Sequence, residues 1–155
     1  NGKNSSTITV DFALKDIEGK TAALSDFLYQ KVVVITFFAT WCEPCKKELI
    51  ELNAIFNKYR QDRLIVLAIS MDLPESRSEV RSLAKKLALS YPVLLDDDFT
   101  AVELFNQRRE APFTLVINIE GKNTWSHSGY VFGDEKILEK IIIEELKKVS
   151  ENSSK

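Results

Sequence analysis

The strongest constraint on the fold is an apolar run of seven residues that leads into a pair of cysteines. Every residue of Val32–Phe38 is β-branched or aromatic, and runs of this kind are typical of strands buried on both faces at the centre of an α/β sheet. The segment Trp41-Cys42-Glu43-Pro44-Cys45 follows closely, and a proline is well placed in the first turn of a helix. The sequence therefore predicts a central strand that turns directly into a helix at the cysteines.

Cys42 and Cys45 are the only two cysteines, and their spacing closes a disulfide across one helical turn. At the start of a helix, free backbone N–H groups and the helix dipole stabilise a thiolate. A thiolate is the attacking species in thiol–disulfide exchange, and a second thiol resolves the mixed disulfide. These two residues predict a redox protein.

The rest of the chain alternates strand and helix patterns, which favours a sheet covered by helices. We expect strands at 7–12, 21–24, 32–38, 64–70, 93–95, 113–118 and 124–130. We expect helices at 44–59, 76–89, 100–105 and 134–149. We predict a polar, flexible lead-in over 1–6, one domain over 7–150 and a flexible tail over 151–155.

Composition gives no support for several classes of partner and cofactor. A net charge of −2 gives no argument for a nucleic acid or an anionic membrane as partner. No metal site is expected, because structural zinc needs four Cys or His ligands and His127 is the only histidine. The chain does not begin with Met, so we take it as a truncated or processed product from which a signal or membrane anchor could have been removed.

The order of elements and the Trp-Cys-x-x-Cys segment resemble the thioredoxin superfamily over nearly the whole chain. Residues 41–48, Trp-Cys-Glu-Pro-Cys-Lys-Lys-Glu, are most similar to the TlpA/ResA branch of bacterial extracytoplasmic thiol–disulfide oxidoreductases, several of which serve cytochrome c maturation. The resemblance implies an α/β thioredoxin-like fold: a central mixed β-sheet flanked by helices on both faces, with an N-terminal β-hairpin arm and an extra helix.

Several residues take roles from this resemblance. Cys42 matches the exposed nucleophile, and Cys45 matches the buried resolving thiol. Pro112 matches the proline whose preceding peptide bond is cis and which lies against the disulfide. Such a bond is affordable only before proline, and it would present Ala111 as an edge for a substrate strand. Phe113 follows in place of the more usual threonine, so the substrate groove could differ.

Glu48 is the candidate acid–base group. It lies one turn after Cys45 on an apolar stripe, where partial burial would raise its pKa and let it exchange a proton with that thiol. The branch carries a glutamate here with an active-site role, and many thioredoxins instead carry a buried acid six residues before the first cysteine, where this chain has Thr36. A first-turn acid that merely favours the helix dipole is an equally weighted alternative.

The residues around the cysteines carry lesser expectations. The charge of Glu43 should oppose the Cys42 thiolate and make the couple reducing. Trp41 is expected to cover the disulfide as a lid, with simple packing as the alternative. The expected substrate-binding residues are Trp41, Glu43, Pro44, Ala111 and Pro112. His127 is more often a surface or core residue than a base.

The leading hypothesis is a protein disulfide reductase that works in the periplasm or on the outer face of a bacterial cytoplasmic membrane. It would need no cofactor, only a protein disulfide substrate and a redox partner that re-reduces the cysteines, and it would be a monomer. A peroxiredoxin-type peroxidase is one alternative, although Ala39 stands where that chemistry places a threonine. A non-catalytic thioredoxin-like binding module and a cytosolic reductant are the others.

Overall fold

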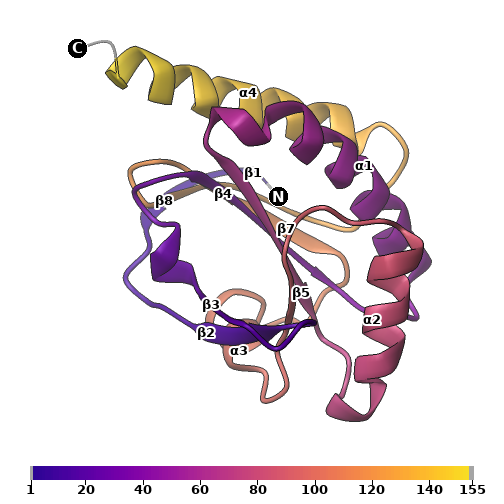
Figure 1. The fold of residues 1–155 in the computed structure, drawn as a ribbon. Coiled ribbons are helices and arrows are strands. Elements are labelled where there is room, and N and C mark those ends of the chain that lie inside the picture. Colours follow the sequence, from indigo (N-terminus) through magenta and orange to yellow (C-terminus); the bar gives the residue numbers. More distant parts are fainter. Residues whose placement is uncertain (1, 154–155) are drawn as a thin grey trace.

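A computed structural model describes residues 2–153 of the chain (Figure 1). Eight strands form one sheet: β1 (Gly2–Thr7), β2 (Ala13–Asp16), β3 (Thr21–Ala23), β4 (Val32–Phe38), β5 (Leu64–Ser70), β6 (Val93–Leu95), β7 (Phe113–Ile117) and β8 (Lys122–Ser128). The α-helices are α1 (Glu43–Tyr59), α2 (Arg77–Lys86), α3 (Thr100–Phe105) and α4 (Asp134–Ser153). Short 3₁₀ turns are η1 (Leu24–Asp26), η2 (Arg60–Asp62) and η3 (Pro74–Ser76).

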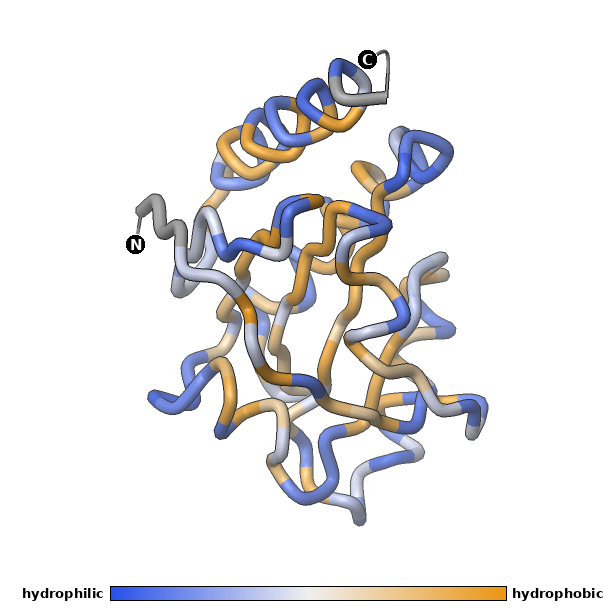
Figure 2. Tube along the Cα trace, turned by 90° about the vertical axis from the view of Figure 1, so that its left-hand side faces the viewer, coloured by the Kyte–Doolittle hydropathy of each residue, from blue (hydrophilic) through white to orange (hydrophobic). Residues whose placement is uncertain are grey.

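The sheet is mixed, with strand order β1-β8-β7-β4-β5-β6-β2-β3. Strand β4 lies inside it, parallel to β5 and antiparallel to β7, and every residue of β4 and β5 is buried. Figure 2 shows the apolar residues gathered along these inner strands and on the inward side of α4. The prediction of a doubly buried central strand is confirmed, and its carboxyl end is where the cysteines begin.

Helices cover both faces of the sheet. The steps from β4 through α1 to β5 and from β5 through α2 to β6 run in the same direction across the sheet. Because such crossovers are right-handed, α1 and α2 lie on one face. Helix α4 packs beside α1 on that face, and α3 lies on the other (Figure 1). Helix α2 is the extra helix expected over 76–89, so the predicted fold class is confirmed.

The N-terminal predictions need correction. The expected strand over 7–12 is wrong, and residues 2–6, expected as a flexible lead-in, belong to β1, which pairs antiparallel with β8. The expected hairpin arm exists but is built from β2 and β3 around the turn at Gly19, whose φ of +89° suits glycine. Phe12 leaves the sheet to pack its ring edge-on against Phe105.

At the other end, α4 begins at Asp134 as expected and runs to Ser153, so residues 151–153 extend the helix. Residues 1, 154 and 155 of the predicted lead-in and tail lie outside the described residues. Within the described residues, no helix is both long and apolar enough to cross a membrane. The domain limits themselves stay a prediction.

Candidate active site

The turn between β4 and α1 places Cys42 at the start of the helix. Cys42 is the N-cap of α1: its backbone is extended, and its Sγ accepts a hydrogen bond from the Cys45 N–H at 3.2 Å. Pro44 occupies the first turn of α1, where its missing N–H leaves no helical bond unmade. The local sequence thus aims the sulfur of Cys42 at the free N–H groups of the helix, which favours a thiolate there.

Cys42 and Cys45 are joined as a disulfide, with their Cα atoms 5.3 Å apart. Only 6 % of Cys42 and 1 % of Cys45 is exposed. The order of exposure matches the expected roles, but the description of Cys42 as an exposed nucleophile is wrong for this disulfide form. The loop at Ala111 contributes to this burial, because the Ala111 carbonyl oxygen is in contact with Cys42 Sγ.

That loop carries the predicted cis bond between Ala111 and Pro112. Cys42 Sγ lies 3.6 Å from the Ala111 carbonyl oxygen, so the two loops meet at the sulfur. The Pro112 carbonyl accepts the N–H of Gly129 at 2.8 Å, which ties this loop to the end of β8. Phe113 packs inward, with its ring centroid 6.4 Å from that of Phe37.

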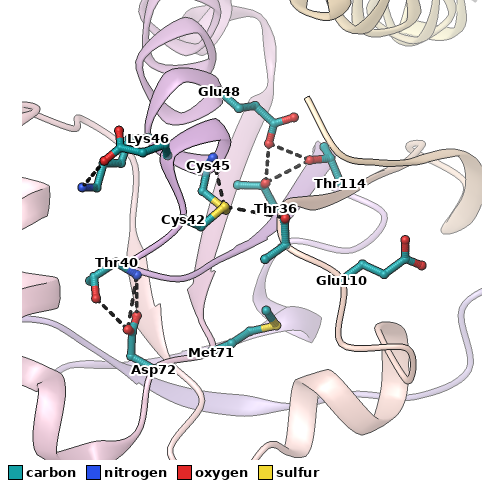
Figure 3. The surroundings of a disulfide bond; sticks show 12 residues. Thr36, Thr40, Cys42, Cys45, Lys46, Glu48, Met71, Asp72, Glu110 and Thr114 are labelled. Atoms are coloured by element: carbon teal, nitrogen blue, oxygen red, sulfur yellow. Dashed lines mark hydrogen bonds and ion pairs between the residues drawn. A yellow bond between two sulfur atoms is a disulfide. The ribbon is translucent and has the colours of Figure 1, made fainter. Parts of the chain in front are cut away.

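Glu48 lies one turn beyond Cys45 and is 5 % exposed. Figure 3 shows its carboxylate turned toward hydroxyls from β4 and β7. Thr36 Oγ1 and Thr114 Oγ1 both donate to Glu48 Oε1, at 2.7 and 2.8 Å. Burial raises the pKa of Glu48 above its ordinary value of 4.5, and the two hydroxyls and His127 lower it by less. Glu48 therefore keeps its proton to a higher pH than an ordinary glutamate.

A count of hydrogens points the same way. The two hydroxyl oxygens are also 2.9 Å from each other, so three close contacts join three oxygens. Each hydroxyl supplies one hydrogen, and a carboxylate supplies none. With an ionised Glu48 both threonines donate to Oε1, and their contact with each other has no hydrogen. A Glu48 protonated on Oε1 donates to one threonine and accepts from the other, so that each of the three contacts has a hydrogen. The geometry favours a neutral Glu48 in this form of the protein.

The charges nearest Cys42 differ from the sequence-based picture. Glu43 is exposed, but its Oε1 accepts a hydrogen bond from Lys46 Nζ at 3.1 Å. The lysine offsets part of the negative charge that was expected to oppose the Cys42 thiolate. An exposed pair of this kind contributes little, roughly 0.2–1 kcal/mol.

Two surface grooves adjoin the cysteine turn. Trp41 is 74 % exposed and lines a groove of about 540 Å³ with Ser78, Ser82 and other residues of α2. Glu43 and Pro44 line a second groove, of about 610 Å³, whose far wall contains Val131 and Phe132. Because Trp41 is so exposed, it is not a packed core residue, and its role as a lid stays a prediction.

Some residues of the site were not singled out as candidates from the sequence. Thr114 contacts Glu48 only because β7 pairs with β4 in a register that puts it opposite Thr36. Asp72 is buried at the end of β5 and binds the turn before Cys42. His127 Nε2 lies 3.2 Å from Asp134 Oδ2. Within residues 2–153 no cluster of three or more His, Cys, Asp or Glu could hold a metal.

Comparison with known proteins agrees with this arrangement. Residues 7–140 match the model of the AhpC/TSA family. The thiol–disulfide oxidoreductase ResA of Bacillus subtilis is 34 % identical over 112 residues, which cover 72 % of this chain and 60 % of ResA. ResA of Bacillus cereus is 30 % identical over 137 residues, covering 88 % of this chain and 69 % of that protein. The chain thus spans only part of the length of these relatives.

Among solved structures, a proposed DsbE thiol:disulfide interchange protein from Chlorobium tepidum superimposes with a TM-score of 0.83 and 25 % identity. The match covers 94 % of this chain and 99 % of that one. Fold, cysteine turn and sequence similarity therefore agree, and the chain belongs to the AhpC/TSA family and, within it, to the relatives of the ResA thiol–disulfide oxidoreductases.

Proposed function

We propose that the protein is a thiol–disulfide oxidoreductase that reduces disulfide bonds of other proteins. The observation that carries this proposal is the Cys42–Cys45 disulfide at the N-terminus of α1, where Cys42 Sγ meets the backbone of Ala111. The name and function of the ResA relatives support it. No metal or organic cofactor is needed, because the two thiols supply both electrons.

The exchange begins from the dithiol form. The Cys42 thiolate attacks one sulfur of the substrate disulfide, and the other substrate sulfur leaves as a thiolate and takes up a proton. Cys45 then loses its proton and attacks Cys42 Sγ, which breaks the mixed disulfide and releases the second substrate thiolate. Two electrons pass to the substrate, and the protein is left with the Cys42–Cys45 bond. A dithiol redox partner must then reduce that bond.

Glu48 is proposed to take the proton of Cys45. As a carboxylate it can accept a proton, and its raised pKa brings it closer to that of a thiol than an ordinary glutamate. Its Oε1 is held by Thr36 and Thr114, while its Oε2 makes no hydrogen bond within the described chain.

Ala111 and Pro112 are proposed to position the substrate. An extended substrate segment that lies along the backbone of Ala111 would bring its disulfide next to Cys42 Sγ, which lies 3.6 Å from the Ala111 carbonyl oxygen. Trp41, Glu43 and Pro44 line the two grooves beside the cysteine turn and would contact the flanking residues of the substrate. The substrate is therefore proposed to be a protein or peptide rather than a small metabolite.

An extracytoplasmic site of action, in the periplasm or on the outer face of a bacterial membrane, extends the proposal. It rests on the resemblance to the TlpA/ResA branch, as do a membrane tether outside this chain and a role in cytochrome c maturation. Each of these is separable from the exchange chemistry. Immunogold labelling of the producing cell would place the protein, and cytosolic labelling would contradict this part alone.

Reduction of insulin disulfides in the presence of dithiothreitol tests the activity. The wild-type protein should accelerate insulin precipitation, and Cys42→Ser should abolish the acceleration. In a separate mixture without dithiothreitol, reduced Cys45→Ser should accumulate a mixed disulfide with insulin, visible on a non-reducing gel. A non-catalytic binding module predicts that Cys42→Ser retains biological activity, and wild-type protein without reductase activity would contradict the proposal.

The peroxidase alternative has no support in the site. The residue three before Cys42 is Ala39, which is fully buried and has no hydroxyl to orient a peroxide. Turnover of hydrogen peroxide by Cys42 would nevertheless reopen it, so the same preparation should be assayed with peroxide.

A further inference from the structure

A buried carboxylate braces the turn that carries Cys42. Asp72 is 8 % exposed, and three donors converge on its two oxygens. Thr40 Oγ1 donates to Oδ1 at 2.7 Å, the Thr40 N–H donates to Oδ2 at 3.0 Å, and Ser70 Oγ donates to Oδ2 at 2.9 Å. A charge that is buried needs such partners, because an unpaired one is costly. The exchange chemistry described above makes no use of this group.

The position of Thr40 connects its contact with Asp72 to Cys42. Thr40 lies between the end of β4 and the N-cap residue Cys42, and the Cys42 N–H returns to the carbonyl of Ala39 at 3.1 Å. Both polar groups of Thr40 that point out of this turn are bound to one carboxylate (Figure 3). Asp72 therefore fixes the turn two residues before the reactive sulfur.

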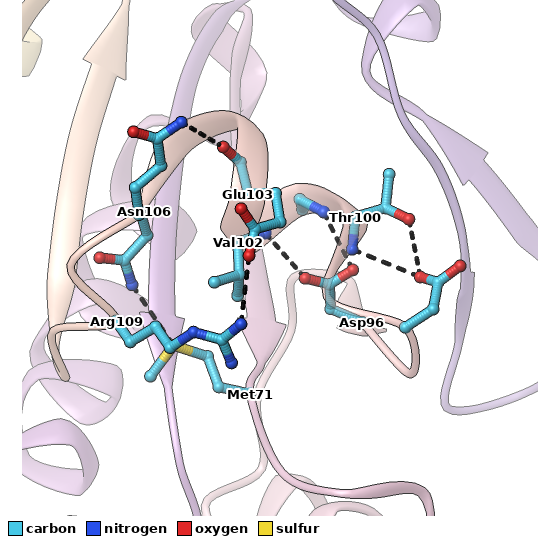
Figure 4. Close-up of polar contacts among 10 residues, drawn as sticks. Met71, Asp96, Thr100, Val102, Glu103, Asn106 and Arg109 are labelled. Atoms are coloured by element: carbon cyan, nitrogen blue, oxygen red, sulfur yellow. Dashed lines mark hydrogen bonds and ion pairs between the residues drawn. The ribbon is translucent and has the colours of Figure 1, made fainter.

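Met71, the residue before Asp72, is linked through Asn106 to the loop that carries Ala111. The Met71 N–H bonds the Phe38 carbonyl at 2.8 Å, and Met71 Sδ accepts a contact from Asn106 Nδ2 at 3.3 Å. Figure 4 shows the contact between Asn106 and Met71. Asn106, 3 % exposed, also binds both backbone groups of Glu110: Nδ2 donates to its carbonyl at 2.9 Å, and Oδ1 accepts its N–H at 3.0 Å. Glu110 directly precedes Ala111.

We propose that Asp72 is a positioning residue for Cys42, and that the Ser70–Met71–Asp72 segment is a common support for the two loops that meet at the sulfur. One end of β5 thereby holds the Cys42 turn through Asp72 and the Ala111 loop through Met71 and Asn106. This inference rests on the proposed exchange chemistry. In this account, the hydrogen bonds of Asp72 and Asn106 keep Cys42 Sγ and the Ala111 carbonyl in contact.

Loss of the hydrogen bonds between Asp72 and Thr40 has two expected effects. A looser turn makes closure of the Cys42–Cys45 bond less favourable, because more freedom of Cys42 is then lost on closure. It also makes the aligned approach of Cys42 to a substrate disulfide rarer, and misalignment of about 1 Å can cost as much as 10²-fold in rate. A residue that only stabilises the fold would lower stability and leave both quantities unchanged.

Asp72→Ala tests the inference through two readouts on the cysteines themselves. The first is the equilibrium constant for disulfide formation against dithiothreitol, and the second is the rate of attack of Cys42 on dithionitrobenzoate. We expect each to fall about tenfold. Asp72→Asn, which keeps the size and an acceptor for the Thr40 N–H, should retain most of both. Asp62→Asn, in η2 at the far end of α1, is the matched control and should change neither.

A thermal midpoint that falls in Asp72→Ala while both readouts stay at wild-type values would overturn the inference. If Asp72→Ala does not fold, Thr40→Val and Thr40→Ser decide the matter: the valine should lower both readouts and the serine should restore them, and equal behaviour of the two would be contrary evidence. Neither reagent is a protein disulfide. Wild-type protein that reacts with both but not with insulin would therefore contradict only the proposed function.

Discussion

At the scale of single residues, the site depends on groups that act through one another. Glu48 could be singled out from its place on the helix, but its partners could not, because Thr36 and Thr114 come from different strands and meet only in the folded sheet. Thr36 was noted as the place of an absent acid and proves to be a hydrogen-bond donor to the acid that is present. Two threonines and one glutamate together make a protonation site.

Replacing Glu48 with Gln should slow the second step of the exchange. The amide keeps the size of the side chain but cannot accept the Cys45 proton, so release of substrate from the mixed disulfide should slow by about 10²-fold. Formation of the mixed disulfide should be unaffected. Acid-quench kinetics with a peptide disulfide resolve the two steps, with Glu51→Gln on the same helix as the control. Release at the wild-type rate would exclude Glu48 as the proton acceptor.

The same substitution should change how stability depends on pH. The raised pKa means that the folded protein holds this proton to higher pH than the unfolded chain does. Between the two pKa values the folded state binds more protons, so the free energy of unfolding falls as pH rises, by about 1.4 kcal/mol per unit of pKa difference. Gln does not titrate. Urea unfolding of the disulfide form should show Glu48→Gln gaining stability relative to wild type above pH 4.5, whereas parallel pH profiles would count against a raised pKa.

Glu43 and Lys46 should change the reactivity of Cys42 in opposite directions. Glu43→Gln removes a negative charge and should increase the fraction of Cys42 present as thiolate at neutral pH, while Lys46→Gln should decrease it. Because Glu43 is exposed and Lys46 is partly exposed, each change should be at most about threefold. Iodoacetamide alkylation of the dithiol form measures it, and the double variant should lie near wild type. Changes of the same sign would show that charge is not the cause.

At the scale of elements, burial decides which predictions succeed. β4, β5, β6 and α3 lie where the sequence places them, because long or bounded apolar runs leave few alternatives. β1 is polar throughout, so nothing in its own sequence reveals that it pairs with β8. The alternation over residues 7–12 resembles a strand but serves to bring Phe12 into the core. Edge pairing and register come from the rest of the sheet.

Helix α1 should show a sharp contrast between its two faces. Leu52 is fully buried against the sheet, whereas Ile50 is 49 % exposed in the groove beside Pro44. Leu52→Ala should lower the free energy of unfolding by about 2–5 kcal/mol. Ile50→Ala should lower it by less than about 1 kcal/mol. Chemical denaturation of the disulfide form measures both, and similar losses in the two variants would contradict the observed orientation of the helix.

At the scale of the whole molecule, the two edges of the sheet bear on self-association. One edge strand, β3, has three residues, and the other, β1, has the polar sequence Gly-Lys-Asn-Ser-Ser-Thr. Short or polar edges are poor templates for pairing with a second copy. The overall fold can be predicted from the sequence because strands and helices alternate clearly at its centre. The association state cannot be predicted in this way, since it depends on surfaces that the sequence pattern does not reveal.

We therefore expect the protein to sediment as a monomer of 17.7 kDa in both the dithiol and the disulfide form. The exposed residues Val131 and Phe132 are the apolar surface most able to disturb this, and they line the groove proposed to receive a substrate. Analytical ultracentrifugation at several protein concentrations gives the answer. A stable dimer that persists in Phe132→Ser would contradict the account of the edges.

The near-complete burial of Cys42 affects when the protein can act on a client. The disulfide form leaves 6 % of Cys42 open to solvent, and we propose that the sulfur stays recessed in the dithiol form, which cannot then reach a disulfide packed inside another folded protein. It can reach only a disulfide whose chain is free to bend out and lie along a loop. We therefore expect the protein to reduce a client before the client has folded around its cysteines, and not to reduce the same disulfide in the mature client.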